Sequence, residues 1–141
     1  MPDDKPRQPD LDLIQMVQRA RMQHDADARP SQTAGVYWIE AKCEQPDCAP
    51  PTPRAGQWVY DTTAAEVDAL WDTVKAATRA GQLGYKSKVS TASRQQGQPG
   101  SRTICARTAD SDDAADVERI RAGLVDLGLG DRLRYERDHA V

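Results

Sequence analysis

The fold of this chain is decided by a strand and a helix in its middle, which read Gly56-Gln57-Trp58-Val59-Tyr60 and then Thr63-Ala64-Ala65-Glu66-Val67-Asp68-Ala69-Leu70-Trp71. Aromatic and β-branched residues fill the first segment, which predicts a strand over 57–61. The second opens with a capping box, in which Thr63 accepts from a helical N–H and Glu66 reaches back. Apolar residues then recur at helical spacing to Ala77, so we expect a helix that ends near Gly81 and buries Trp71.

The flanking sequence supplies the other elements of the fold. Period-two and β-branched patterns predict strands over 35–42, 86–91, 102–108 and 133–137. An apolar stripe predicts a first helix over 10–23, and a last helix follows the acidic cluster 110–113 and ends at Gly128. The order is one helix and then ββαββαβ. This order predicts an α+β fold with a mainly antiparallel sheet and helices on one face.

Length and composition indicate one domain. The chain has 141 residues, the size of a typical single domain. Its mean hydropathy is −0.75 and 38% of its residues are hydrophobic, so we expect a modest core. No signal pattern and no membrane-length apolar stretch is recognisable, so we predict a cytoplasmic location and no membrane partner. We predict a disordered tail over 1–9, a helix and linker over 10–33, and a single α+β domain over 34–141.

A one-sided basic stretch indicates a ligand site. Residues 83–107 carry five basic side chains and no acidic one, although the formal net charge of the chain is −3. A local excess of positive charge attracts an anionic partner. The five residues are Lys86, Lys88, Arg94, Arg102 and Arg107.

Strand alternation assigns most of this stretch to one face, because residues two apart in a strand share a face. With Val89, Ile104 and Ala106 in the core, the opposite face carries Lys86, Lys88, Ser90, Thr103, Cys105 and Arg107. With Val59 also in the core, two aromatic rings join that open face, and Arg102 at a strand start swings toward it. The predicted ligand-binding set is Trp58, Tyr60, Lys86, Lys88, Ser90, Arg102 and Arg107.

The chemistry of this set suits a phosphate-bearing ligand. Aromatic planes stack on bases, and lysine or arginine neutralises phosphate, as on nucleotide and single-strand binding surfaces. We therefore predict binding of a nucleotide or single-stranded RNA on the open sheet face. An alternative stays open, in which the two rings fill a second small core and the cations form a solvated rim.

The cysteines and histidines do not predict a cofactor. Cys43 and Cys48 lie in a proline-rich loop over 43–56, and we expect two free thiols there rather than a disulfide. A zinc site needs four ligands with closer cysteine pairs, so we predict no metal. Cys105 is expected to be a small, buried or half-buried residue of its strand. The acidic cluster 110–113 is interpreted as helix capping rather than a cation site.

Several blocks resemble an uncharacterised family that includes the basophilic-leukaemia-expressed protein of animals and small microbial proteins. The resemblance covers about 36–138, and its most specific part is Leu83-Gly84 followed by Lys88-Val89-Ser90-Thr91-Ala92. Further matching blocks are Gly56-Gln57-Trp58-Val59-Tyr60, Val67-Asp68-Ala69-Leu70-Trp71, Thr103-Ile104-Cys105, Asp110-Ser111-Asp112-Asp113 and Arg134-Tyr135-Glu136-Arg137-Asp138.

The resemblance implies the fold of the cap-binding translation initiation factor 4E, a curved antiparallel sheet with helices on its convex side. Recognition of the cap itself does not carry over, because no second stacking tryptophan aligns. Microbial members are often labelled phosphothreonine lyases, which would make Lys88 a catalytic base and Arg102 with Arg107 a phosphate clamp. Only His24 and His139 are available as the acid, so this enzyme is the second hypothesis. A protein-interaction domain that uses the helix over 10–23 is the third.

Overall fold

Eight elements build the part of the chain that the structure describes. The structure is a computed structural model, and it describes residues 11–92 and 100–138. The predicted tail over 1–9, Arg94 and His139 lie outside these residues. The elements in chain order are α1 (Leu11–Asp27), β1 (Trp38–Lys42), β2 (Gly56–Thr63), α2 (Ala64–Arg79), β3 (Lys86–Ser90), β4 (Ser101–Thr108), α3 (Ala114–Asp126) and β5 (Arg134–Arg137).

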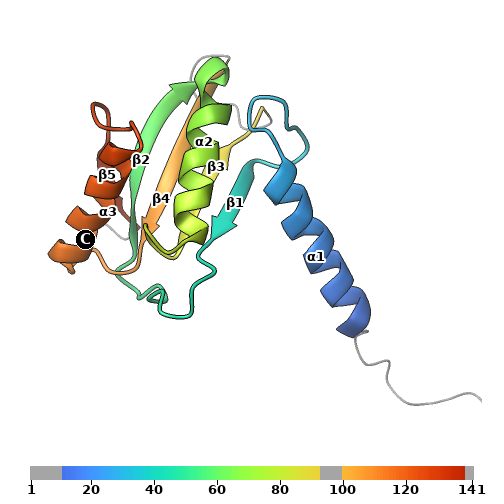
Figure 1. Ribbon diagram of the computed structural model, residues 1–141, viewed down its shortest axis with the longest axis horizontal. Helices are drawn as coiled ribbons and strands as arrows, with labels where there is room; N and C mark the ends of the chain where they lie inside the picture. Colours follow the sequence, from blue (N-terminus) through green and yellow to red (C-terminus); the bar gives the residue numbers. More distant parts are fainter. Residues whose placement is uncertain (1–10, 93–99, 139–141) are drawn as a thin grey trace, which may run out of the picture.

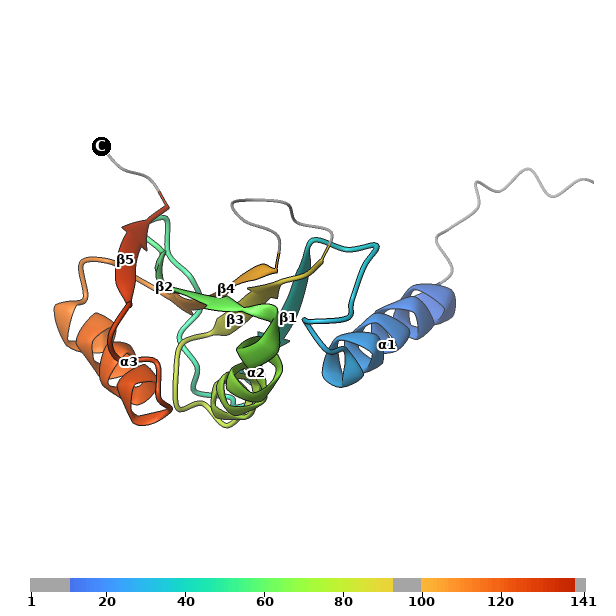
Figure 2. The same cartoon turned by 90° about the horizontal axis from the view of Figure 1, so that it is seen from above.

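The strands form one antiparallel sheet in the order β1-β3-β4-β2-β5 (Figure 1). Helices α2 and α3 lie on the same side of this sheet, and no helix of the described residues covers its other side (Figure 2). The predicted α+β class, the antiparallel sheet and the placement of helices on one face are therefore confirmed. Among the described residues, no helix combines the length and apolar character needed to cross a membrane.

The core lies between the sheet and the two covering helices. Helix α2 turns Val67, Trp71 and Val74 toward the strands, and each of these side chains is fully buried. Their i, i+4, i+7 spacing places them on one helix face, as the sequence predicts. The sheet contributes Ile39, Val89 and Ile104, and α3 contributes Ile120 and Leu124.

Helix α1 lies beside the β1 edge, away from the other helices (Figure 1). It ends at Asp27, four residues later than predicted. Its apolar side chains are largely exposed, namely Leu11, Leu13, Ile14, Met16 and Val17. The segment after it is anchored to the domain, because both Ser31 N and Ser31 Oγ donate to the carboxylate of Asp68 in α2, at 3.0 and 2.5 Å.

The predicted capping box at the start of α2 is wrong. Thr63 is the N-cap residue, but its side chain accepts no capping hydrogen bond. The N–H of Ala64 donates instead to the carbonyl of Gly100 at 2.7 Å, because β2 runs directly into the helix while still paired with β4. At the start of α3 the expectation holds, since Asp113 accepts from the N–H of Asp116.

Gly84 is required by a close approach of two backbone segments. A Cβ atom at this position would lie 1.8 Å from the carbonyl oxygen of Arg107, so the loop before β3 would have to move away from β4. We expect Gly84→Ala to lower the free energy of unfolding by about 3 kcal/mol, measured by urea denaturation. Gly130→Ala is the matched control, because its Cβ would make ordinary contact with Val125 at 3.7 Å. Equal stability of the two variants would contradict this account.

Candidate ligand-binding face

One row of residues crosses the side of the sheet that the helices leave open. The pairings Glu40–Lys88, Lys88–Cys105, Cys105–Val59 and Val59–Arg134 connect all five strands of the sheet. Directly paired residues of neighbouring strands share a face. The predicted placement of Lys88 and Cys105 on the open face is therefore confirmed, and so is that of Lys86, Ser90, Thr103 and Arg107.

The prediction that Trp58 and Tyr60 line the open face is wrong. Trp58 pairs with Ala106 and Tyr60 with Ile104, so both rings lie on the helix-covered side. The indole N–H of Trp58 donates to the carbonyl of Val117 in α3 at 2.9 Å. Two rings contribute more apolar area to the core than one valine does, so β2 turns its aromatic residues inward. Val59 lies on the open side.

Arg102 is also absent from the open face. Its side chain lies on the helix-covered side, and the residue is only 7% exposed. The guanidinium donates to the backbone carbonyls of Pro30 and Ser31, at 3.2 and 3.4 Å. The predicted swing toward the ligand face is therefore wrong, because the buried charge is satisfied by the linker after α1. Arg102 acts as an anchor for that linker.

Most cations of the open face are already paired with carboxylates. Lys86 lies 3.3 Å from Glu40, and Arg134 lies 2.5 Å from Asp61. Arg107 forms a two-pronged ion pair with Asp138 just after β5. A phosphate would compete with these carboxylates, so the number of basic residues overstates the attraction of this face for anions.

Lys88 differs from these residues. Its Nζ lies over the ring of Trp38 in β1, 4.3 Å from the ring centroid. Among the described residues no carboxylate pairs with it, although Glu40 is its direct partner across the strands. The ring attracts the ammonium through its electron-rich face, and a phosphate that binds Lys88 has no such carboxylate to displace. Sequence reasoning missed Trp38, although strand alternation places it two residues before Glu40 on the same face.

Ser90 and Thr103 bond to each other within the sheet. The Ser90 hydroxyl accepts from the N–H of Thr103 at 2.8 Å, and Ser90 is only 3% exposed. The Thr103 hydroxyl donates to Asp61 at 3.0 Å. The two hydroxyls therefore make hydrogen bonds that link β3, β4 and β2 on the open face.

Cys105 lies at the centre of the face. Burial raises the pKa of its thiol to about 11, although the nearby charges of Lys88, Arg107 and Arg134 act in the opposite direction. The thiol is therefore neutral near physiological pH and unsuited to nucleophilic chemistry. The strand register places the three cations around Cys105, because Lys88 is its cross-strand partner, Arg107 lies two residues along β4, and Arg134 lies beyond Val59 in β5.

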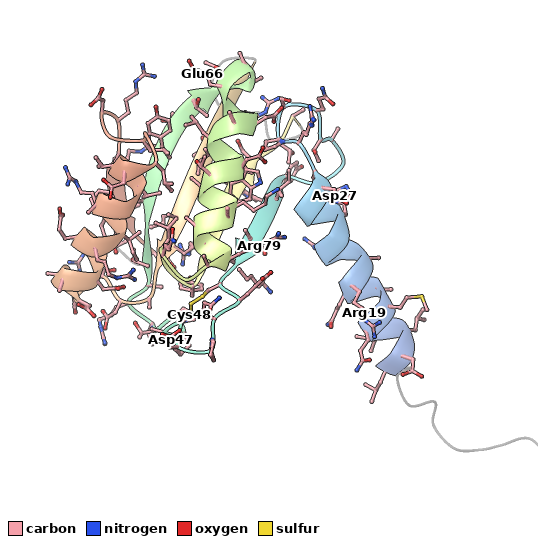
Figure 3. All side chains as sticks on the ribbon, viewed as in Figure 1. Arg19, Asp27, Asp47, Cys48, Glu66 and Arg79 are labelled. Carbon is pink, nitrogen blue, oxygen red and sulfur yellow. A yellow bond between two sulfur atoms is a disulfide. The ribbon has the colours of Figure 1, made fainter. Side chains whose placement is uncertain are left out.

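The expected pair of free thiols in the loop before β2 is wrong, because Cys43 and Cys48 form a disulfide. Their Cα atoms are 6.4 Å apart, within the range that a disulfide spans. Cys48 lies in the loop at the end of the sheet shown in Figure 3. Among the described residues, no group of three or more histidine, cysteine or acidic side chains is arranged to hold a metal ion.

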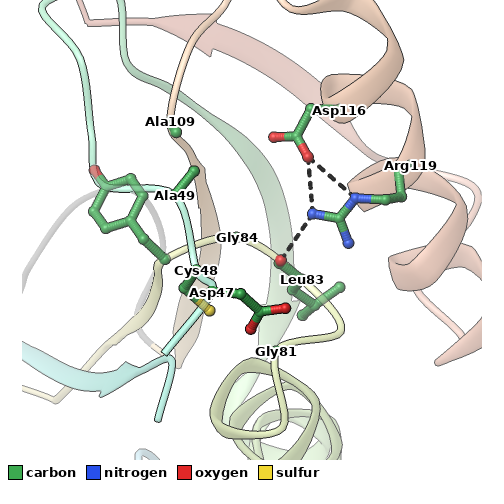
Figure 4. A pocket seen from close by; sticks show the side chains of 10 residues that line it. Asp47, Cys48, Ala49, Gly81, Leu83, Gly84, Ala109, Asp116 and Arg119 are labelled. Carbon is green, nitrogen blue, oxygen red and sulfur yellow. Dashed lines mark hydrogen bonds and ion pairs between the residues drawn. The ribbon is translucent and has the colours of Figure 1, made fainter. Parts of the chain in front are cut away.

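A pocket of about 320 Å³ lies beside this disulfide (Figure 4). Its walls come from the disulfide loop, the turn after α2 and the first turns of α3. Arg119 donates to Asp116 at 2.8 Å and to the carbonyl of Leu83 at 3.1 Å, so its charge is used within the wall. Asp47 adds a second carboxylate, so the pocket offers no surplus positive charge for a phosphate. Sequence reasoning missed it, because its residues come from separate segments.

The lyase hypothesis gains no geometric support. It needs an acid near Lys88, but His24 lies exposed on α1 and outside the sheet. The other candidate, His139, is outside the described residues. The lyase therefore stays a prediction from the resemblance.

Thiol titration tests the chemistry of the three cysteines. We expect the native, unreduced protein to react slowly with an aromatic disulfide reagent near neutral pH, because Cys105 is buried and its pKa is about 11. The unfolded, unreduced chain should release one thiol, and the reduced unfolded chain three. Rapid reaction of native Cys105, or three thiols without reduction, would contradict the arrangement.

The fold is similar to that of a schistosome translation initiation factor eIF4E, whose crystal structure was solved in complex with m7GpppA and 4E-BP. The TM-score is 0.59 at 13% sequence identity, and the similarity covers 91% of this chain and 70% of the other. The expected initiation factor 4E-like fold is therefore confirmed. No match was found among curated proteins. Residues 50–138 match the family described as basophilic leukemia-expressed protein Bles03. Because this match spans more than half of the chain, the chain belongs to that family.

Proposed function

We propose that this protein is a non-enzymatic binding module for a phosphate-bearing ligand, a nucleotide or single-stranded RNA, on the open face of the sheet. The observation that carries the proposal is the placement of Lys88 over the ring of Trp38. It brings together a cation that can bind phosphate and an aromatic ring that can stack on a base, on a face that no described helix covers. Base stacking on an aromatic ring typically contributes about 1–3 kcal/mol.

The geometry changes which residues serve the proposed site. Trp38 replaces Trp58 and Tyr60 as the stacking plane, because the latter rings pack under the sheet. Lys88 meets the phosphate, and Arg107 provides a second donor on the same face. Lys86 lies beside them but shares its charge with Glu40. The ligand therefore crosses β1, β3 and β4.

The structural comparison gives one example of this fold with a phosphate-bearing ligand. The schistosome factor of the same fold was solved with m7GpppA, which carries bases and phosphates. At 13% identity this similarity shows the fold alone, so the ligand of this chain is proposed from its own residues. The predicted cytoplasmic location remains a prediction. The Cys43–Cys48 disulfide bears on it, because reducing compartments keep such pairs open.

We also propose a protein partner for the segment 10–23. The observation that favours this is the exposure of the apolar side chains of α1, which reaches 68% at Leu11 and 63% at Met16. Contiguous exposed apolar residues indicate an interaction surface. The schistosome factor was solved with the protein 4E-BP, which is consistent with a fold that accepts protein partners.

Lys88→Ala tests the proposed ligand face. We expect this variant to bind a short, labelled single-stranded RNA at least about tenfold more weakly at low salt, because one phosphate contact is lost. The slope of affinity against salt should fall by about one unit. Fluorescence anisotropy measures both quantities.

Two controls separate this face from a general charge effect. Lys75→Ala removes the same charge from helix α2, on the covered side, and should change the affinity less than about twofold. Trp58→Phe should lower stability and leave binding unchanged, whereas Trp38→Ala should weaken binding. Equal loss in Lys88→Ala and Lys75→Ala, or no binding by the parent protein at low salt, would rule out the proposed site.

Two truncations test the role of α1. Removal of residues 1–26 should change the free energy of unfolding by less than about 1 kcal/mol and leave RNA binding intact, because the described side chains removed are largely exposed. Removal of residues 1–32 should cost about 2–4 kcal/mol, because Arg102 and Asp68 lose their partners in the linker. Urea denaturation measures both. Equal stability of the two truncated proteins would show that the linker contacts do not anchor the domain.

A further inference from the structure

Arg107 is held as a two-pronged donor on the open face. Its NH1 donates to Asp138 Oδ1 at 2.6 Å, and its NH2 donates to Asp138 Oδ2. Two further donors contact uncharged groups, since Nε donates to the hydroxyl of Tyr85 at 2.9 Å and NH1 also donates to Gln57 Oε1 at 3.2 Å. A planar guanidinium fork of this kind matches a carboxylate and a phosphate equally well.

The partners of Arg107 differ in how they are anchored. Gln57 belongs to β2 inside the sheet, and Tyr85 directly precedes β3. Asp138 follows the last residue of β5, where its N–H donates to the carbonyl of Ala55 at 3.1 Å. Its side chain is 32% exposed, whereas that of Arg107 is 14% exposed. The neutral partners therefore keep the guanidinium aimed at the face when the carboxylate moves away.

The fork lies close to the proposed phosphate contact. Cys105 is the direct cross-strand partner of Lys88, and Arg107 lies two residues further along β4 on the same face. Lys88 and Arg107 are therefore diagonal neighbours across β3 and β4, which are typically about 7–8 Å apart, a span that two successive phosphates of a nucleic-acid strand can bridge.

We propose that the Arg107 fork is a second phosphate subsite of the open face, and that the carboxylate of Asp138 occupies it until a ligand phosphate displaces it. This proposal rests on the proposed function, and it adds that a carboxylate of the protein itself competes with the ligand phosphate for Arg107. The apparent affinity of the face then equals its intrinsic affinity multiplied by the fraction of molecules in which Asp138 leaves the fork uncovered. Single-stranded RNA is the ligand that can place successive phosphates on Lys88 and Arg107.

Asp138→Asn tests the subsite, because the amide keeps the size of the side chain and removes its charge. We expect this variant to bind a short, labelled single-stranded RNA about tenfold more tightly than the parent protein at low salt. Glu136→Gln is the matched control, since it removes one negative charge from β5 on the same face and leaves the contact of Arg107 with Asp138 in place. The new amide oxygen can still accept from Gln57, as Glu136 does. It should change the affinity less than about threefold. The double variant Asp138→Asn with Arg107→Ala should lose the gain.

The outcomes separate the two proposals. Equal gains in Asp138→Asn and Glu136→Gln, or a gain that survives Arg107→Ala, would overturn the subsite and leave the Lys88 face in place. Failure of Asp138→Asn to fold, measured by its thermal unfolding, would also overturn it, because Asp138 would then be a structural clamp. If Lys88→Ala binds as tightly as the parent protein while Asp138→Asn still gains affinity, the Lys88 proposal fails and the Arg107 fork remains.

Discussion

The pairing of β3 with β4 is the constraint on which the rest of the structure depends. Its register places Lys88 opposite Cys105 and Val89 opposite Ile104, so the basic and the apolar residues separate onto opposite faces. A shift by one residue would exchange the two faces, since strand side chains alternate. The apolar residues then pack under α2, and Gly84 allows the loop before β3 to touch the backbone of Arg107.

The same pairing determines the electrostatics of the open face. Its cations Lys86, Arg107 and Arg134 each find a carboxylate, so the face is a network of ion pairs rather than a bare positive patch. The most exposed of these pairs, Arg134 with Asp61, contributes little to stability by itself. Their effect is on recognition, because each carboxylate must be displaced or bypassed by an incoming anion. Lys88 over Trp38 avoids this competition, which is why the proposed site is centred on it.

Much of the fold could be predicted from local patterns, because those patterns report directly on burial. The apolar stripe of α2 that includes Trp71 and the alternation around Val89 in β3 each separate side chains that face the core from side chains that face away from it. The prediction that Val59 faces the core was wrong. Trp58, Val59 and Tyr60 are three consecutive apolar or aromatic residues, so their pattern does not show which of them faces the core. The structure resolves that ambiguity through α3, whose Val117 carbonyl accepts from Trp58.

The candidate site was less predictable, because it depends on pairs that are distant in sequence. Nothing local to Arg102 indicates that carbonyls of the linker, about seventy residues earlier, satisfy its charge. The competition of Asp138 for Arg107 and the Cys43–Cys48 disulfide depend in the same way on how loops return to the sheet. Trp38 is the one part of the site that local pattern could have located. It lies two residues before Glu40 in β1, so alternation places both side chains on the same face of the sheet.

The central claim is that ligand binding takes place on the open face and not among the rings beneath the sheet. An NMR titration of the three tryptophan indole N–H signals with single-stranded RNA tests it most directly. The account predicts that the Trp38 signal shifts with added RNA, while those of Trp58, bonded to Val117, and Trp71, buried under the sheet, stay in place. A shift of the Trp58 signal with an unchanged Trp38 signal would contradict it.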